Sequence, residues 1–157
     1  MTSERIIAPV TFAHDSLEAA AVGAELAAAL GAELVLAGIA PVAPPDPSYG
    51  GPTELEALEL QVEHQRVVDQ IMSERLAELA GALPDGVRCR TILTWGPVGP
   101  TLVEAAREEH ADLVVVPIRR ESELAHLLHD RADRYVLHHS DVPVIVVPTN
   151  GDSAAIR

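Results

Sequence analysis

The sequence predicts an α/β domain built on one doubly wound sheet of five parallel strands, with helices on both faces. Two observations predict this class. Short apolar runs alternate with helical stretches along the whole chain in the order β-α-β-α-β-α-β-α-β, and such alternation requires helical crossovers between parallel strands. The run DLVVVP, residues 112–117, is apolar at every position that would face a helix layer, which is typical of a central parallel strand. We expect the strand order 3-2-1-4-5, which places ligands outside the carboxyl ends of the first and fourth strands.

The first two strands are predicted at residues 5–10 and 33–40, which are short apolar runs. Between them, Asp15 is expected to cap a helix, with Glu18 at capping-box spacing, and Gly31 is expected to end it. The apolar stripe predicted for this helix consists of Leu17, Ala20, Ala21, Ala24 and Ala28.

A long second helix is predicted to begin at Thr53 and to reach about Leu83. It follows a segment at residues 41–52 that holds five of the twelve prolines and must be a loop. The turn Pro84-Asp85-Gly86 ends the helical stretch. The helix is expected to bury a stripe of seven apolar residues, namely Leu55, Leu58, Val62, Val68, Met72, Leu76 and Leu79.

The second half of the chain supplies the remaining strands and helices. Residues 87–95 alternate apolar and polar side chains, which favours a strand at the sheet edge. A short helix follows the prolines at 97 and 100, where a missing N–H is least harmful. A final helix is predicted at 124–139, ending at His138-His139, and a final strand at 142–148. The last helix is expected to bury Leu124, Leu127, Leu128, Tyr135 and Val136.

Length and composition indicate one domain over residues 1–157, with a core at about 4–148 and a polar tail at 149–157. The formal charge of −13 and the absence of lysine exclude general nucleic-acid binding, because a phosphate polymer would be repelled. No apolar stretch is long enough to span a membrane, and the first residues lack a secretion-signal pattern. Cys89 is the only cysteine and is expected to be a buried strand residue. A cytoplasmic location follows as the expectation.

Three segments resemble the universal stress protein family, and together the resemblance covers about residues 4–148. They are IIAPV with the helix and strand that follow it, EAAREEHADLVVV, and YVLHHSDVPVIVVP, of which the last is the most specific. The resemblance implies the adenine nucleotide alpha hydrolase-like fold. It also implies a homodimer built by the last strand, Val142–Pro148, whose apolar and uncharged edge invites pairing with another chain.

The ATP-binding branch of that family carries a Gly-x2-Gly-x9-Gly-Ser/Thr motif after the fourth strand, and this chain lacks it. Aligning DLVVVP and YVLHHSDVP places Pro117, Arg120, Asp130 and Arg131 at the four motif positions, and Thr11 at the family's adenine-side Asp. Glycines in such a loop let backbone N–H groups approach phosphates. Proline has no N–H, and Asp130 would repel a polyphosphate. The resemblance therefore implies a degenerate nucleotide pocket with no cofactor.

The remaining polar residues leave two alternatives open beside ordinary ion pairs. Arg119, Arg120 and Arg131 would form a small-anion site if they converge, but pairing with nearby acids, Asp130 and Asp133 among them, is preferred. The helical spacing of His126, His129, Asp130 and Asp133 suits metal ligands, but we expect a solvated stripe and no metal site.

No nucleophile or phosphate-loop motif is present, so no enzymatic activity is expected. The first functional hypothesis is a non-catalytic homodimer with a stress-response or regulatory role. The alternatives are a binding module for a small anion and a weak nucleotide-binding or ATP-hydrolysing protein.

Overall fold

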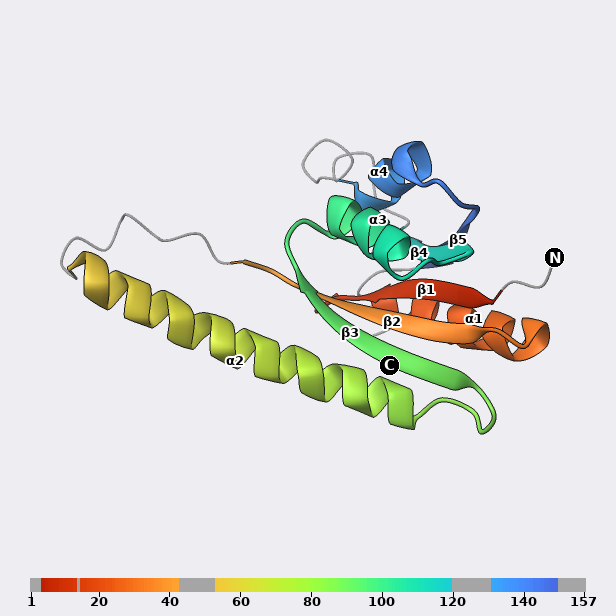
Figure 1. The fold of residues 1–157 in the computed structure, drawn as a ribbon, viewed down its shortest axis with the longest axis horizontal. Coiled ribbons are helices and arrows are strands. Elements are labelled where there is room, and N and C mark those ends of the chain that lie inside the picture. Colours follow the sequence, from red (N-terminus) through yellow and green to blue (C-terminus); the bar gives the residue numbers. More distant parts are fainter. Residues whose placement is uncertain (1–3, 14, 43–52, 120–130, 150–157) are drawn as a thin grey trace.

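The computed structural model describes residues 4–13, 15–42, 53–119 and 131–149. They form a five-stranded parallel sheet with helices on both faces (Figure 1). The observed order β3-β2-β1-β4-β5 confirms the predicted 3-2-1-4-5 topology, with β3 and β5 at the two edges. The elements are β1 (Arg5–Val10), α1 (Asp15–Leu30), β2 (Glu33–Ala40), α2 (Glu54–Gly81), β3 (Arg88–Trp95), α3 (Val98–Glu108), β4 (Leu113–Arg119), α4 (Ala132–His139) and β5 (Val144–Thr149).

Alternate residues of the strands supply two separate cores, as the two-residue period of a strand requires. On one face, Ile6, Leu34 and Leu36 pack with α1 and α2, and Met72 is the most deeply buried residue of α2. On the other face, Ile7 and Val35 pack with α3 and with Val136 of α4. The central strands are thus covered on both sides, and this explains their nearly continuous apolar sequence.

Two local signals mark helix ends where the sequence predicts them, and a third marks the predicted turn before β3. Thr53 caps α2: its hydroxyl accepts the Glu56 N–H at 3.3 Å, and Glu56 Oε2 accepts the Thr53 N–H at 2.9 Å. Gly31, with φ +65°, ends α1. Gly86, with φ +92°, lies in the turn that enters β3, and both glycines occupy a backbone region that other residues avoid.

Two of the predicted apolar stripes are wrong in part. In α1 the buried residues include Ala19, Ala20, Ala24 and Ala27, whereas the predicted Ala21 and Ala28 are exposed. Alanine occupies so many positions of this helix that its apolar face has little contrast with the rest. In α2 only Met72 and Leu76 are buried; Leu55, Leu58 and Val62 are exposed, because the first half of the helix extends past the sheet (Figure 1).

The last helix and strand differ from the prediction in smaller ways. Helix α4 ends at His139, as expected, but it starts only at Ala132, because Arg131 before it is extended; the helix predicted over 124–139 is therefore not continuous. The predicted core residues Leu124, Leu127 and Leu128 lie outside the described residues. Tyr135 is exposed instead of buried and stacks on His139, with ring centroids 3.9 Å apart. Strand β5 begins two residues later and ends one residue later than predicted.

Charged residues connect the amino ends of the strands. The Asp112 carboxylate accepts the backbone N–H groups of Glu4 at 2.9 Å and Arg5 at 3.0 Å. Arg5 Nε lies 3.0 Å from Glu33 Oε1, and Arg90 pairs with both Glu33 and Glu109. Ion pairs therefore connect the strands at their amino ends, which lie opposite the carboxyl ends where a ligand is expected.

Cys89 is half-buried on β3 beside the α2 core, as a structural residue. Burial, and then the nearby charge of Glu33, raise the pKa of its thiol. Because the folded state favours the thiol over the thiolate, the stability that this preference contributes is present below the unfolded pKa and is lost as the pH rises through the folded one. We expect the free energy of unfolding of the native protein, relative to Cys89→Ser, to fall as the pH rises above about 8.5, the ordinary pKa of a thiol. A difference that is the same below and above this pH would contradict the raised pKa.

Candidate functional site

The candidate site lies at the carboxyl ends of the two central strands β1 and β4. On the β1 side, Thr11 is held in a tight turn by Ser16 of α1, which is fully buried. The Ser16 hydroxyl accepts the Thr11 N–H at 3.2 Å and donates to a carbonyl, that of Ala13 at 2.9 Å. The Thr11 hydroxyl in turn accepts the Ala13 N–H at 3.1 Å. Thr11 therefore closes the turn between β1 and α1, and it offers no carboxylate to an adenine.

On the β4 side, the strand continues past Pro117 to Arg119. Pro117 pairs in register with Val147 of β5, and the next pairs are Ile118 with Pro148 and Arg119 with Thr149. The hydroxyl of Thr149, a buried residue, donates to the Ile118 carbonyl at 3.4 Å. The prediction that the strand ends at Pro117 is therefore wrong by two residues, and the first glycine position of the motif lies inside the sheet.

Pro9 of β1 and Pro117 of β4 also limit the pairing between these two strands. Strand β1 pairs with β2 from Arg5 to Val10, but it pairs with β4 only at Ile6 and Ile7. Continuing that register would place Pro9 opposite Val116 and Val10 opposite Pro117. Neither proline can donate a backbone hydrogen bond, which explains why the β1–β4 ladder ends before them.

Arg131, at the closing Ser/Thr position of the motif, occupies the N-cap of α4 without a side-chain hydrogen bond to the helix backbone. Its guanidinium is bound bidentately by Asp133, with Nη2 to Oδ2 at 3.1 Å and Nε to Oδ1 at 3.2 Å. Both side chains are less than one-fifth exposed. Arg119 is half-buried and also has an interaction partner. The preferred ion-pair interpretation is thus confirmed for Arg131 and Asp133.

Several predicted residues lie outside the described part of the chain. Arg120 and Asp130 are among them, as are His126 and His129 of the candidate metal stripe. Among the residues that the structure does describe, no three His, Cys, Asp or Glu side chains form a group that would hold a metal ion. The side chain of Asp15 is also undescribed, although α1 begins at this residue, so its capping role stays a prediction.

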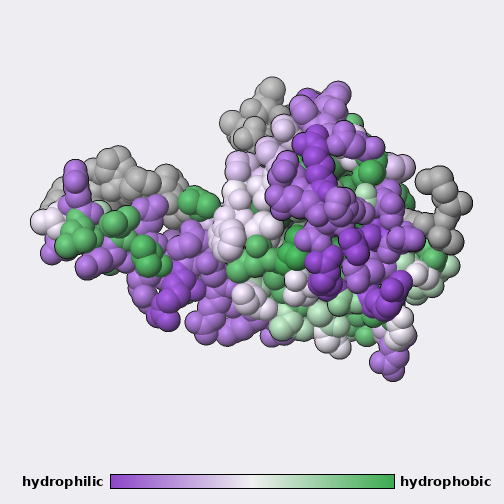
Figure 2. All heavy atoms as spheres, in the orientation of Figure 1, coloured by the Kyte–Doolittle hydropathy of each residue, from purple (hydrophilic) through white to green (hydrophobic). Residues whose placement is uncertain are grey.

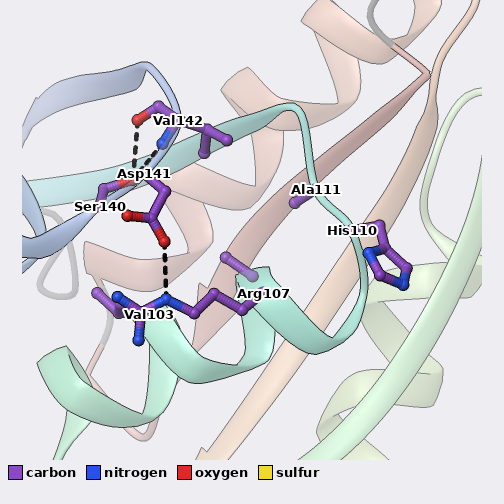
Figure 3. A pocket seen from close by; sticks show the side chains of 8 residues that line it. Val103, Arg107, His110, Ala111, Ser140, Asp141 and Val142 are labelled. Carbon is purple, nitrogen blue, oxygen red and sulfur yellow. Dashed lines mark hydrogen bonds and ion pairs between the residues drawn. The ribbon is translucent and has the colours of Figure 1, made fainter.

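A cavity of about 150 Å³ lies at the opposite, amino edge, between α3 and the start of β5 (Figure 3). Arg107 and Asp141 meet across it, with Nε to Oδ2 at 2.8 Å, and Glu104 lies 3.5 Å from the same guanidinium. Ser140 is bonded to the backbone of Val142. These polar groups bind one another and connect α3 with the segment that precedes β5. The cavity therefore adds nothing to the site at the carboxyl ends of the strands.

Sequence reasoning missed the residues that close the site. Ser16 and Thr149 are the buried polar residues of the described chain, and each fixes the end of a strand through its hydroxyl. Ser16 could have been found from its position directly after Asp15, the predicted helix cap, because a hydroxyl there can bond to the backbone of the preceding turn.

The fold is a doubly wound parallel sheet whose strand order reverses between β1 and β4. The model of the universal stress protein family matches residues 2–148, and the chain belongs to this family. A comparison with curated proteins found no match.

Solved structures share the fold at low sequence identity. A universal stress protein from Lactobacillus plantarum is 19% identical with a TM-score of 0.65, over 94% of this chain and 99% of that one. A universal stress protein in complex with cAMP is 22% identical with a TM-score of 0.58, over 94% and 98%. The protein from Archaeoglobus fulgidus in complex with dAMP is 15% identical with a TM-score of 0.54, over 94% and 99%.

Proposed function

We propose that this chain is a non-catalytic, homodimeric stress-response or regulatory protein that acts through protein partners and does not bind ATP in the family mode. One observation carries the proposal. Strand β4 runs through Pro117 to Arg119 while paired with β5, so the residues that would begin a phosphate loop belong to the sheet instead.

The groups that would contact a nucleotide are either missing or engaged. Pro117 has no N–H for a phosphate. Arg131 replaces the closing hydroxyl of the motif, and Asp133 binds its guanidinium. Thr11 replaces the adenine-side carboxylate, and its backbone N–H is bound by Ser16. The pairing of Arg131 also weighs against a small-anion site, because one of the three arginines that would converge is already neutralised.

The homodimer is proposed on the free edge of β5. This strand is the last of the sheet and carries Val144, Ile145, Val146 and Val147, with no charged residue along it. An uncharged edge with unpaired backbone groups is a template for a second strand. A two-fold axis would join the β5 strands of two chains into one continuous sheet.

A cytoplasmic location is part of the proposal. Within the described residues, no helix combines the length and the apolar character needed to cross a bilayer. The single cysteine fits a reducing compartment.

The test is the thermal denaturation midpoint of the full chain, measured with and without millimolar ATP and magnesium. We expect no shift. The nucleotide complexes of two structural neighbours make this test necessary, since the fold itself accommodates nucleotides. A ligand at 100 times its Kd adds about 2.7 kcal/mol to the free energy of unfolding, which is easily measured. Sodium triphosphate serves as the ionic control, and a midpoint that rises with ATP but not with triphosphate would contradict the proposal.

A further inference from the structure

The first half of α2 presents an apolar stripe to solvent. We call residues 54–67 the α2 arm. Leu55, Leu58 and Val62 of the arm are 65%, 56% and 62% exposed, although leucine and valine at such spacing usually lie in a core. Figure 1 shows this part of the helix extending past the ends of β2 and β3, and Figure 2 shows apolar residues gathered at its tip.

The exposed stripe lies in line with the buried one. Leu55, Leu58 and Val62 follow the spacing i, i+3, i+7, and the same three-and-four spacing leads on to Met72 and Leu76, which pack on the sheet. Between the two parts lies Asp69, whose Oδ1 accepts hydrogen bonds from Gln65 at 2.9 Å and from Trp95 Nε1 at 2.7 Å. The helix thus leaves the sheet at Trp95, and its core-type face continues uncovered for about two turns.

The rim of the stripe is acidic. At 100° per residue, Glu54 and Glu59 each lie about 40° outside its two borders. The arm also carries Glu56 and Glu63, against a single basic residue, Arg66, and the Arg66 guanidinium is bound by Glu63 at 2.7 Å. An apolar stripe with acidic borders complements a helix that carries leucine-type residues between lysines or arginines.

We propose that the α2 arm is a docking surface for a basic amphipathic helix of another protein. This inference rests on the proposed mode of action through protein partners and names the chemistry of one. A second copy of this chain fits the surface less well, because it would bring another Glu54 and Glu59 to the same borders. The net charge of −13 per chain adds to that repulsion. A membrane of anionic lipids is disfavoured by the same charge.

The experiment uses the full chain and a synthetic helical peptide of about 18 residues, made of leucine at helical spacing and lysine elsewhere. Fluorescence anisotropy should show saturable binding that weakens between about 0.05 and 0.3 M salt. Leu58→Glu should weaken it at least about tenfold, because it places a carboxylate in the centre of the stripe. Leu60→Glu is the matched control: this residue is 65% exposed and lies on the opposite side of the helix, so binding should change less than about twofold.

Three results would overturn the proposal: absence of peptide binding by the native protein, equal losses in Leu58→Glu and Leu60→Glu, or a native dimer that Leu58→Glu dissociates, which would assign the arm to a second copy. Circular dichroism confirms that both variants fold. The outcome is separable from that of the proposed function. A chain that binds no peptide and is unaffected by ATP loses only the docking surface, whereas a chain stabilised by ATP loses the proposed function even if the peptide binds.

Discussion

Gly38→Val is expected to lower the free energy of unfolding by about 3 kcal/mol, because it overpacks the contact that holds α2 on the sheet. A Cβ at Gly38 would lie 2.7 Å from Leu76 Cδ1 and 3.0 Å from Met72 Cγ. These two are the buried residues of α2, so the substitution acts at the centre of the contact between this helix and the sheet. Both side chains are at most 4% exposed, so neither can turn aside into solvent. Denaturant titration followed by circular dichroism measures the loss.

Gly81→Val supplies the control for this prediction. Gly81 also belongs to the α2 region, but no atom lies within 4 Å of the place where its Cβ would be. Its replacement should change the free energy of unfolding by less than about 1 kcal/mol. Equal effects of the two substitutions would show that the close approach at Gly38 does not determine how α2 is docked.

Val146→Pro is expected to dissociate the proposed homodimer while leaving the monomer folded. The Val114 N–H donates to the Pro143 carbonyl at 3.0 Å, and Val114 pairs with Val144. The alternation of a parallel ladder then directs the N–H groups of Ile145 and Val147 toward β4 and those of Val144 and Val146 toward the free edge. Proline at 146 therefore removes an edge donor without removing a β4–β5 hydrogen bond.

The expected increase in the dimer Kd is at least about 100-fold. A two-fold interface contains the strand twice, so the loss of one hydrogen bond of about 1.4 kcal/mol is counted twice. Sedimentation equilibrium over a range of concentrations measures it. Val146→Ala retains the N–H and should retain the dimer, whereas Val147→Pro should destabilise the monomer itself. If Val146→Pro has the native Kd, or if the native chain is monomeric throughout, β5 is not the interface we propose.

The strand order could be predicted because the pattern of apolar and polar residues within each strand indicates where the strand lies in the sheet. The alternation in β3 marks an edge, and the apolar run of β4 marks a centre, so only a few topologies remain. The start of α2 was equally predictable, because Thr53 caps the helix through local hydrogen bonds. The exposure of the first half of α2 could not be predicted. Leu55 and Met72 belong to the same helical spacing, and one is exposed and the other buried only because the helix extends past the sheet.

The position of the candidate site could be predicted from the sequence, but its strand pairing and side-chain contacts could not. The topology alone locates it at Thr11 and Pro117. That Pro117 lies within β4 depends on its pairing with β5, and the engagement of Arg131 depends on the short reach to Asp133. Long-range pairing and side-chain geometry of this kind leave no periodic signal in the sequence.

The most direct test of the central claim is mass spectrometry of the small molecules released when the full chain, purified from cells without added nucleotide, is denatured. We expect less than about one-twentieth of a mole of adenine nucleotide per mole of chain, because a pocket without phosphate donors retains none through purification. A stoichiometric amount of ATP or another adenine nucleotide would contradict it, because the ligand would then occupy the edge that Pro117 and Thr11 close.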